Sequence, residues 1–309
     1  MKRNIFIATS TFGEFDLEPI NKLTKNNFTF SSNKLKRKLT EDELIKYGKD
    51  SFGIIAGTEN YSRSVIKELG NLKIISRLGV GLDNIDLDAV KEKNIKILTT
   101  KTTPAPSVAE LVLGLIIDLS RHITCHDKNM RKEIWNKKMG SLVKGKTLGI
   151  VGMGNIGKEL ISLSKGFNFN LLACDINKDL IFSKKNKVKY CSLDHLLSHS
   201  DIVSMHLNLS DDTRKIINKK NIQLMKKNAI IINTSRGEVI DEDSLYEALF
   251  KNRILGAGLD VFDKEPYSGK LCNLNNVILT PHIGSYSKEI RIDMESEAVN
   301  NILEEANYV

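Results

Sequence analysis

Short apolar runs alternate with amphipathic helical patterns along almost the whole chain of 309 residues. Such alternation predicts parallel strands joined by helices, because a crossover between parallel strands usually contains a helix. In the first part of the chain, the pattern predicts strands at residues 5–8, 52–56, 72–76 and 95–98, with a helix at 62–69.

A loop with two prolines, at residues 102–106, interrupts this alternation. The apolar helix expected at 107–121 is either an ordinary core helix or one that bridges domains or packs on a second subunit. From Lys146 the alternation restarts, and the strands expected there are 148–151, 171–174, 202–206, 229–233, 258–262 and 277–279. A last helix, at about 288–306, is expected to pack back on the first domain.

The pattern as a whole predicts an α/β protein of two doubly wound parallel-sheet domains, since a chain of this length exceeds one small core. We expect residues 102–284 to form one domain. Residues 1–101 and 285–309 would form the other, which is then discontinuous in sequence.

Composition limits the class of protein. A hydrophobic content of 41% and a charged content of 27% are typical of soluble globular proteins. The apolar stretch 111–117 is too short to span a bilayer, and the run at 5–8 is too short for a signal peptide, so we expect no membrane association and a cytoplasmic location. The four cysteines have no paired spacing, which predicts neither a disulfide framework nor a metal site.

The formal net charge of +8 raises the question of nucleic-acid binding. Lysines are spread along the chain among acidic residues, and aromatic residues make up only 6%. The densest basic run, 34–38, precedes a capping-box pattern at 40–43 and is interpreted as solvated surface. We therefore expect no nucleic-acid partner, while a basic surface favours a small anionic substrate.

A glycine loop opens the second half of the chain, in the stretch GKTLGIVGMGNIGKEL. The pattern Gly152-x-Gly154-x-x-Gly157 is weak evidence alone, but here a strand precedes it and a helix follows. Gly152 permits a tight turn, Gly154 lets a pyrophosphate approach, and Gly157 allows close helix–strand packing. The helix N-terminus from Asn155 offers N–H groups to phosphates. The sequence predicts a dinucleotide site.

Asp175 ends the next predicted strand. A carboxylate there accepts hydrogen bonds from the adenosine ribose and repels a 2′-phosphate, which favours NAD over NADP. Lys178 lies near enough in sequence to weaken that preference.

Polar residues lie at or just past the ends of several predicted strands, at the edge of the sheet where ligands bind. They are Asp175, His206, Thr234, Ser235, Arg236, Asp260 and His282. Hydride transfer at a hydroxyl carbon requires a proton to move at its oxygen, and an imidazole, with an ordinary pKa of about 6.5, performs this near neutral pH. Glu265 is the candidate carboxylate for the other ring nitrogen, and Arg236 the candidate to hold a substrate carboxylate. The alternative is that His282 is a structural residue.

These blocks resemble the D-isomer-specific 2-hydroxyacid dehydrogenases. The similar segments are GKTLGIVGMGNIGKEL, INTSRGEVIDEDSLYEAL, GAGLDVFDKEP, LTPHIGS and SRLGVGLDNIDLDAV, and they cover residues 52–290 in the family's order. The resemblance implies a flavodoxin-like substrate domain, an NAD-binding Rossmann domain, a cleft between them, and a homodimer.

The resemblance also implies roles for individual residues. Arg236, Glu265 and His282 would be catalytic, with His282 as general acid/base. NAD would be bound by Val80, Gly152, Gly154, Asn155, Ile156, Gly157, Asp175, His206, Leu207, Thr234, Ser235, Asp260 and Gly284. The substrate would contact Arg77, Gly79, Val80, Gly81, Arg236 and His282, with the glycines and Val80 presenting N–H groups to its carboxylate.

Arg77 stands where the 3-phosphoglycerate dehydrogenase branch places an arginine for the substrate phosphate, so we expect 3-phospho-D-glycerate as substrate. Since the chain ends at residue 309, we expect no C-terminal serine-sensing domain. His206-Leu207-Asn208 departs from the family's His-x-Pro, and the segment 103–110 looks short, which puts the substrate in doubt. The alternatives are a glyoxylate or hydroxypyruvate reductase and, in another class, an NADH-sensing corepressor-like binding protein.

Overall fold

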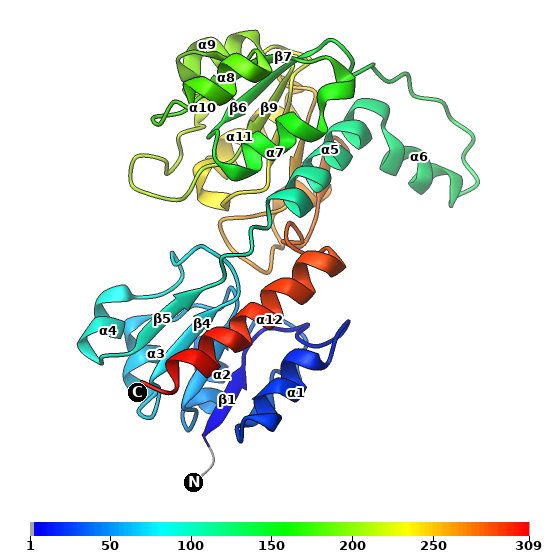
Figure 1. Cartoon of the computed structure of the whole chain (residues 1–309). Coiled ribbons are helices and arrows are strands. Elements are labelled where there is room, and N and C mark those ends of the chain that lie inside the picture. The colour runs from blue at the N-terminus through cyan, green and yellow to red at the C-terminus, as the bar shows by residue number, and fades with distance from the viewer. Residues whose placement is uncertain (1–2, 309) are drawn as a thin grey trace. The chain divides into compact units, whose positions relative to one another are not determined.

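A computed structural model describes residues 3–308 and divides them into two compact units. One unit extends to Pro104 and resumes at Tyr286, and the other comprises Ala105–Ser285. Each unit contains its own parallel sheet with helices on both faces (Figure 1). The predicted fold class, two doubly wound α/β domains, is confirmed.

The first unit has a five-stranded sheet in the order β2-β1-β3-β4-β5, which is the flavodoxin-like order. Its elements are β1 (Asn4–Ile7), α1 (Glu18–Lys25), β2 (Thr29–Ser32), α2 (Glu41–Gly48), β3 (Gly53–Ala56), α3 (Arg63–Glu68), β4 (Ile74–Arg77), α4 (Leu87–Glu92), β5 (Lys96–Thr99) and α12 (Lys288–Glu305).

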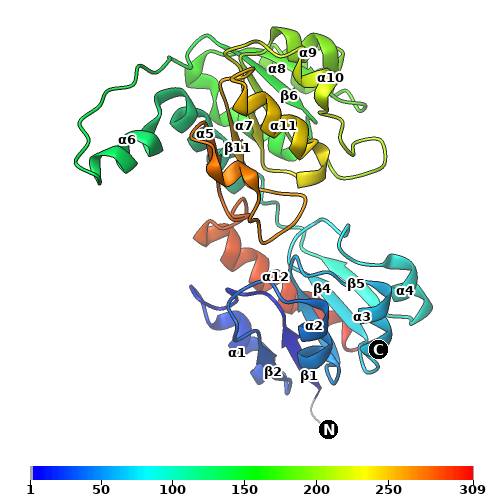
Figure 2. The same cartoon turned by 180° about the vertical axis from the view of Figure 1, so that it is seen from behind.

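Helices cover both faces of this sheet because the buried strands carry apolar side chains in both directions. One face packs against α2, α3 and α4, and the other packs against α1 and α12 (Figures 1 and 2). Met294, Val299 and Ile302 of α12 lie in the same buried cluster as Ile5 and Ile74 of the strands. The C-terminal helix is thus part of the first unit's core.

The second unit has a seven-stranded parallel sheet in the order β12-β11-β10-β9-β6-β7-β8. Its elements are α5 (Ala105–Arg121), α6 (Ile123–Met130), β6 (Thr147–Val151), α7 (Asn155–Leu163), η1 (Lys165–Phe167), β7 (Asn170–Cys174), α8 (Leu180–Asn186), β8 (Lys189–Tyr190), α9 (Leu193–His199), β9 (Ile202–Met205), α10 (Lys219–Ile222), β10 (Ile230–Asn233), η2 (Gly237–Val239), α11 (Glu242–Phe250), β11 (Gly256–Leu259), η3 (Lys270–Asn273) and β12 (Val277–Leu279).

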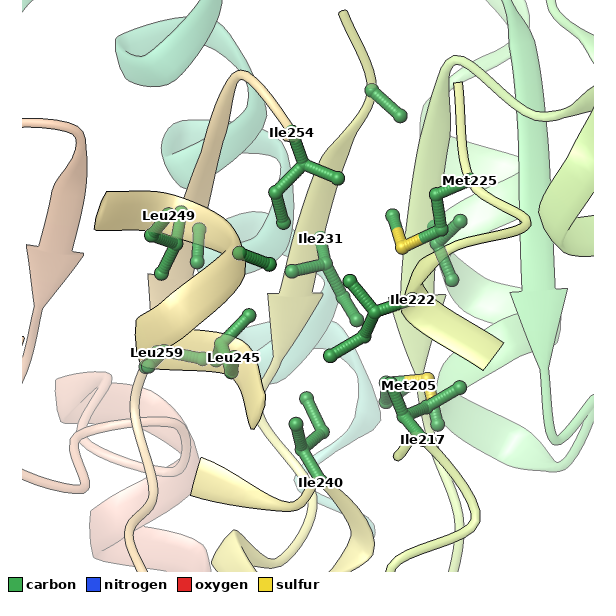
Figure 3. Close-up of a cluster of buried hydrophobic side chains, with 14 of the residues drawn as sticks. Met205, Ile217, Ile222, Met225, Ile231, Ile240, Leu245, Leu249, Ile254 and Leu259 are labelled. Atoms are coloured by element: carbon green, nitrogen blue, oxygen red, sulfur yellow. The ribbon is translucent and has the colours of Figure 1, made fainter. Parts of the chain in front are cut away.

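Two buried clusters hold this sheet between its helices. Figure 3 shows the cluster under α10 and α11, where Ile222 and Leu245 face Ile231 of β10. On the other face, Val112 and Ile116 of α5 pack with α7 and the strands. Helix α5 is therefore a core helix, which was one of the two interpretations that the sequence allowed for residues 107–121.

Several elements differ from their predicted positions. Strand β2 was not predicted, because all four of its residues are exposed and leave no apolar pattern. The two-residue strand β8 was also missed. Strand β11 lies at Gly256–Leu259, two residues before the predicted start at Gly258, so that Asp260 follows the strand rather than lying within it. None of the helices in residues 3–308 is long and apolar enough to cross a membrane.

Candidate active site

The residues predicted at strand ends gather at one edge of the second unit's sheet. Strands β6, β9, β10, β11 and β12 are parallel neighbours, so their carboxyl ends share that edge. The chain reverses its direction of winding between β6 and β9, which is the topological switch point where ligands bind in such sheets.

The glycine loop after β6 has the geometry of a dinucleotide cradle. Gly152 has φ +90°, and a Cβ there would lie 2.5 Å from the His206 carbonyl oxygen. At Gly157 a Cβ would lie 2.8 Å from the Gly152 carbonyl oxygen, so this glycine allows helix and strand to pack closely. At Gly154 a Cβ would meet no atom within 4 Å, which leaves that side open to a ligand.

Helix α7 begins directly after this loop, at Asn155. Its N-cap is Gly154, and no side chain caps the helix, so the N–H groups of the first turn, Ile156 included, are left for another acceptor. Unpaired N–H groups and the positive end of the helix dipole suit a pyrophosphate. The loop and helix fit a dinucleotide.

Asp175 follows β7 and is tied to the glycine loop. Its carboxylate accepts hydrogen bonds from the N–H of Met153 at 2.6 Å and from the N–H of Asn177 at 2.7 Å. Lys178, three residues further along the chain, has its Nζ 6.0 Å from the ring centroid of Tyr190. The acid is thus fixed at the strand end where the ribose binds in this type of loop.

Two buried polar atoms just past the ends of the neighbouring strands β9 and β10 have no partner among the described residues. They are the Nδ1 of His206, after β9, and the Oγ1 of Thr234, after β10. The other ring nitrogen of His206 is 2.9 Å from the Ser204 hydroxyl, and burial lowers the pKa of His206 to about 4, so the ring is neutral at physiological pH. Buried unpaired polar atoms are costly, and a bound ligand is one way to satisfy them.

Leu207 lies against the glycine turn, since its Cδ2 would be 3.1 Å from a Cβ on Gly152. Ser235 is buried, and its hydroxyl donates to the Asn233 Oδ1 at 2.9 Å. Both residues therefore shape the loops beside the predicted cofactor site.

Asp260 organises the loop that carries His282. Its buried carboxylate accepts hydrogen bonds from the Thr280 hydroxyl at 2.6 Å and from the N–H groups of Ile283 and Gly284, each at 2.8 Å. Burial raises the pKa of Asp260, and these hydrogen bonds act against that rise. Asp260 therefore has a structural role within this loop, in addition to the contact with the nicotinamide that the sequence predicts.

His282 and Glu265 are in direct contact. The Nδ1 of His282 lies 2.9 Å from Oε2 and 3.1 Å from Oε1 of Glu265. His282 has φ +56°, a left-handed conformation that is uncommon outside glycine and is found often at functional sites. With Nδ1 paired, Nε2 is the ring nitrogen left to exchange a proton with a substrate.

The Arg236 loop lies against the loop that carries Glu265. A Cβ on Gly237 would come within 2.0 Å of the Phe262 backbone, so the two loops are in close contact and position 237 requires glycine. Asn233 holds the Arg236 loop by donating to the Arg236 carbonyl oxygen at 2.8 Å and accepting from the Ser235 N–H at 3.1 Å. Arg236 also donates to the Ser235 carbonyl oxygen.

The predicted substrate loop of the first unit follows β4. Its Gly79 has φ +136°, and the Gly79 N–H donates to the Thr100 hydroxyl at 3.1 Å. The sequence predicted that the N–H groups of residues 79–81 bind a substrate. Because the Gly79 N–H is already bonded, only those of Val80 and Gly81 remain as candidates. Within residues 3–308 these two donors have no acceptor.

Sequence reasoning missed Asn233, Thr280 and Thr100. Each acts on the backbone or on another side chain of the loops, and no motif used above contains them in a chemical role. The one available signal was position, since Asn233 ends a predicted strand directly before Thr234, and Thr280 follows one two residues before His282.

Comparison with known proteins identifies the second unit. Residues 113–284 match the family model described as D-isomer specific 2-hydroxyacid dehydrogenase, NAD binding domain. The predicted cofactor, NAD, agrees with that description, and the glycine loop fits it.

Relatives match over most of the chain. The hydroxypyruvate reductase of Thermotoga maritima is 41% identical, over 86% of this chain and 89% of that protein. The D-3-phosphoglycerate dehydrogenase of Methanocaldococcus jannaschii is 39% identical over 81% of this chain, but only 49% of that protein is covered. A glyoxylate reductase structure from Paecilomyes thermophila superimposes with a TM-score of 0.82 at 29% identity, covering 99% of this chain and 96% of that one.

Proposed function

We propose that this chain, which belongs to the D-isomer-specific 2-hydroxyacid dehydrogenase family, is an NADH-dependent reductase of hydroxypyruvate or glyoxylate. The observation that carries the chemistry is the pairing of His282 Nδ1 with Glu265, at 2.9 Å, on the same sheet edge as the glycine loop. It gives a positioned proton donor beside a dinucleotide site.

The substrate assignment differs from the sequence-based preference for 3-phospho-D-glycerate. The similarity to a hydroxypyruvate reductase extends over 89% of that protein, whereas similarity to a phosphoglycerate dehydrogenase extends over about half of it. These comparisons support the alternative of a hydroxypyruvate or glyoxylate reductase over the first choice.

Each residue of the site has a part in this reaction. NAD supplies the hydride in its reduced form and accepts it in its oxidised form. In the direction of reduction, His282 gives a proton from Nε2 to the carbonyl oxygen of the 2-oxo acid, and the product is a 2-hydroxy acid, of D configuration where hydroxypyruvate is the substrate. Glu265 holds the imidazole, Arg236 binds the substrate carboxylate, and the N–H groups of Val80 and Gly81 bind it as well.

We also propose NAD rather than NADP, on the grounds of Asp175. A 2′-phosphate would place a dianion beside this carboxylate, which already accepts two backbone hydrogen bonds. Asp260 and Gly284 shape the loop near the nicotinamide, and Thr234 and His206 offer the unpaired buried atoms described above.

A homodimer accords with the exposed apolar side chains of residues 123–142. Helix α6 and the segment after it extend from the body of the second unit (Figure 1). Trp135 is 77% exposed and Met139 is 92% exposed, and Ile123, Met130 and Leu142 are exposed as well. Apolar side chains gathered on one segment favour burial against a second copy of the chain. Light scattering after gel filtration should give a particle of twice the chain mass. In the W135S/M139S variant the mass should fall to that of a single chain.

Oxidation of NADH with a panel of 2-oxo acids tests the function. The panel is glyoxylate, hydroxypyruvate, pyruvate and 3-phosphohydroxypyruvate. We expect the highest kcat/KM with hydroxypyruvate or glyoxylate. A higher kcat/KM with 3-phosphohydroxypyruvate would contradict the substrate assignment, and no turnover of any of them by folded protein would contradict the reaction.

A further inference from the structure

Arg77 is committed to the protein's own backbone. The side chain is only 7% exposed at the end of β4. Its Nε donates to the Gly81 carbonyl oxygen at 3.1 Å, and its Nη1 donates to the Leu78 carbonyl oxygen. One guanidinium therefore joins the first and last residues of the loop 78–81.

A buried carboxylate accompanies this guanidinium. Glu59, in the loop after β3, is 3% exposed and accepts a hydrogen bond from the Gly57 N–H at 2.8 Å. Burial raises the pKa of Glu59, and the positive charges of Arg77 and Lys38 act in the opposite direction. Backbone hydrogen bonds from Gly57 and from Glu59 itself lower that pKa more than the two charges do, and the charge of Arg77 adds to their effect.

The loop itself is shaped to the arginine. A Cβ on Gly79 would lie 3.1 Å from Arg77 Nη1 and 3.4 Å from Cζ, so the loop backbone packs directly on the guanidinium. Asn84 connects the same loops from the other side, because its Nδ2 donates to the carbonyl oxygens of Gly57 at 3.2 Å and Glu59 at 2.5 Å. The conformation that exposes the Val80 and Gly81 N–H groups thus depends on these contacts.

We propose that Arg77 is a positioning residue which, together with Glu59, holds the loop 78–81 in its carboxylate-binding form, and that it does not recognise a substrate phosphate. This inference rests on the proposed function, because that function gives the loop its carboxylate. It also narrows the substrate class to small 2-oxo acids without a phosphate, since the guanidinium already donates to two carbonyl oxygens.

Arg77→Met tests the proposal in the full-length protein. We expect the KM for hydroxypyruvate and the KM for 3-phosphohydroxypyruvate to rise by a similar factor, about 10-fold for one lost charge-assisted contact, with kcat and NADH affinity little changed. Glu59→Gln should also raise both KM values, by a smaller factor than Arg77→Met does. A KM that rises only for the phosphorylated substrate would overturn the proposal.

Hydrogen–deuterium exchange separates this proposal from the proposed function. In Arg77→Met, without any substrate, the amides of Leu78 and Gly79, which donate to the Ala56 carbonyl oxygen and the Thr100 hydroxyl, should exchange at least about 10-fold faster than in the wild type, because the loop has lost its clamp. Unchanged exchange there would overturn the clamp even if the enzyme is active. Failure of the proposed function would show instead as a wild-type protein that turns over no 2-oxo acid.

Two further variants guard against a simple folding defect. The double variant E59Q/R77M removes both buried charges, so that neither is left unpaired, and it should still show the faster exchange. Arg63→Met is the matched control, because Arg63 is also in the first unit and pairs with Glu92 at 2.7 Å, but on the surface. It should leave the exchange of the Leu78 and Gly79 amides and both KM values unchanged.

Discussion

The imidazole of His282 and the carboxylate of Glu265 come from the loops after β12 and β11 and meet with Nδ1 2.9 and 3.1 Å from the two carboxylate oxygens. A carboxylate on Nδ1 fixes the ring orientation and the tautomer, so that proton exchange occurs at Nε2. The pair has the form of a general acid/base with its orienting partner.

Replacing His282 with Ala should lower kcat by about 10²–10⁴-fold, the range typical of a lost general acid/base. NADH affinity, measured by fluorescence titration, should stay within a few-fold of the wild type, because the glycine loop and Asp175 are untouched. Glu265→Gln should reduce kcat by a smaller factor, since the imidazole remains. Equal losses of turnover and NADH affinity in His282→Ala would indicate a structural histidine.

Asp260→Asn should destabilise the protein and reduce turnover together. The amide keeps one acceptor oxygen and places an NH2 group where a backbone N–H now donates, so either the Gly284 N–H or the Ile283 N–H loses its buried acceptor. We expect a loss of about 2–3 kcal/mol in the free energy of unfolding, measured in urea. Thr280→Val removes only the hydroxyl bond and should cost about 1 kcal/mol. An Asp260→Asn variant as stable and active as wild type would show that the loop is held in another way.

Asp175 should control the choice between the two nicotinamide cofactors. In Asp175→Ser the carboxylate that repels a 2′-phosphate is gone, and we expect the ratio of kcat/KM for NADH to that for NADPH to fall by about 10-fold or more. Asp179→Asn is the control, since Asp179 follows the same strand but pairs with Lys158 at 2.6 Å. An unchanged ratio in Asp175→Ser would remove the basis for the preference for NAD.

The ionised carboxylate of Asp263 should lower the free energy of unfolding above about pH 6. Burial, and then the charges of Glu242 and Glu238, raise its pKa from 3.8 to about 6. The folded state binds this proton more tightly than the unfolded chain, so the penalty is absent below about pH 4, grows up to about pH 6, and is complete above it. Asp263→Asn should therefore raise Tm at pH 7.5, and raise it less at pH 4.5.

Asp243→Asn is the control for that prediction. Asp243 belongs to the same acidic surface, but a hydrogen bond from Lys270, 2.7 Å away, lowers its pKa. Its replacement should leave Tm at pH 7.5 unchanged or slightly lower, since an exposed ion pair contributes little. A Tm for Asp263→Asn at or below that of the wild type at pH 7.5 would contradict the assigned penalty.

The sequence predicted the fold where burial leaves a clear pattern. Strands such as β3 and β9 are buried at every position because helices cover both faces of their sheets, and most of their residues are therefore apolar. Strand β2, with exposed polar residues, carries no such signal and is defined only by its pairing with β1. Gly256 likewise hid the start of β11, because its fit against Asn276 and Leu119 is a tertiary feature.

Candidate site residues were predictable where the chemistry demands one residue type at one place. Gly152, Asp175 and His282 are of this kind. The arrangement around Arg77 was not predictable. The guanidinium donates to two backbone carbonyl oxygens and lies in the electrostatic field of an acid 18 positions earlier in the chain, and only the fold brings these groups together. Sequence alone shows an arginine before a glycine loop, and it does not show whether that guanidinium is free to bind a phosphate.

Transfer of deuterium from labelled NADH tests the central claim most directly. The protein is incubated with hydroxypyruvate or glyoxylate and NADH that carries deuterium at C4, each C4 stereoisomer separately, and the product acid is analysed by mass spectrometry. With one of the two stereoisomers, we predict a 2-hydroxy acid with one deuterium at C2, of D configuration where hydroxypyruvate is the substrate, and almost none of it with His282→Ala. A product without deuterium from either stereoisomer, or no product from the folded wild-type protein, would contradict the account.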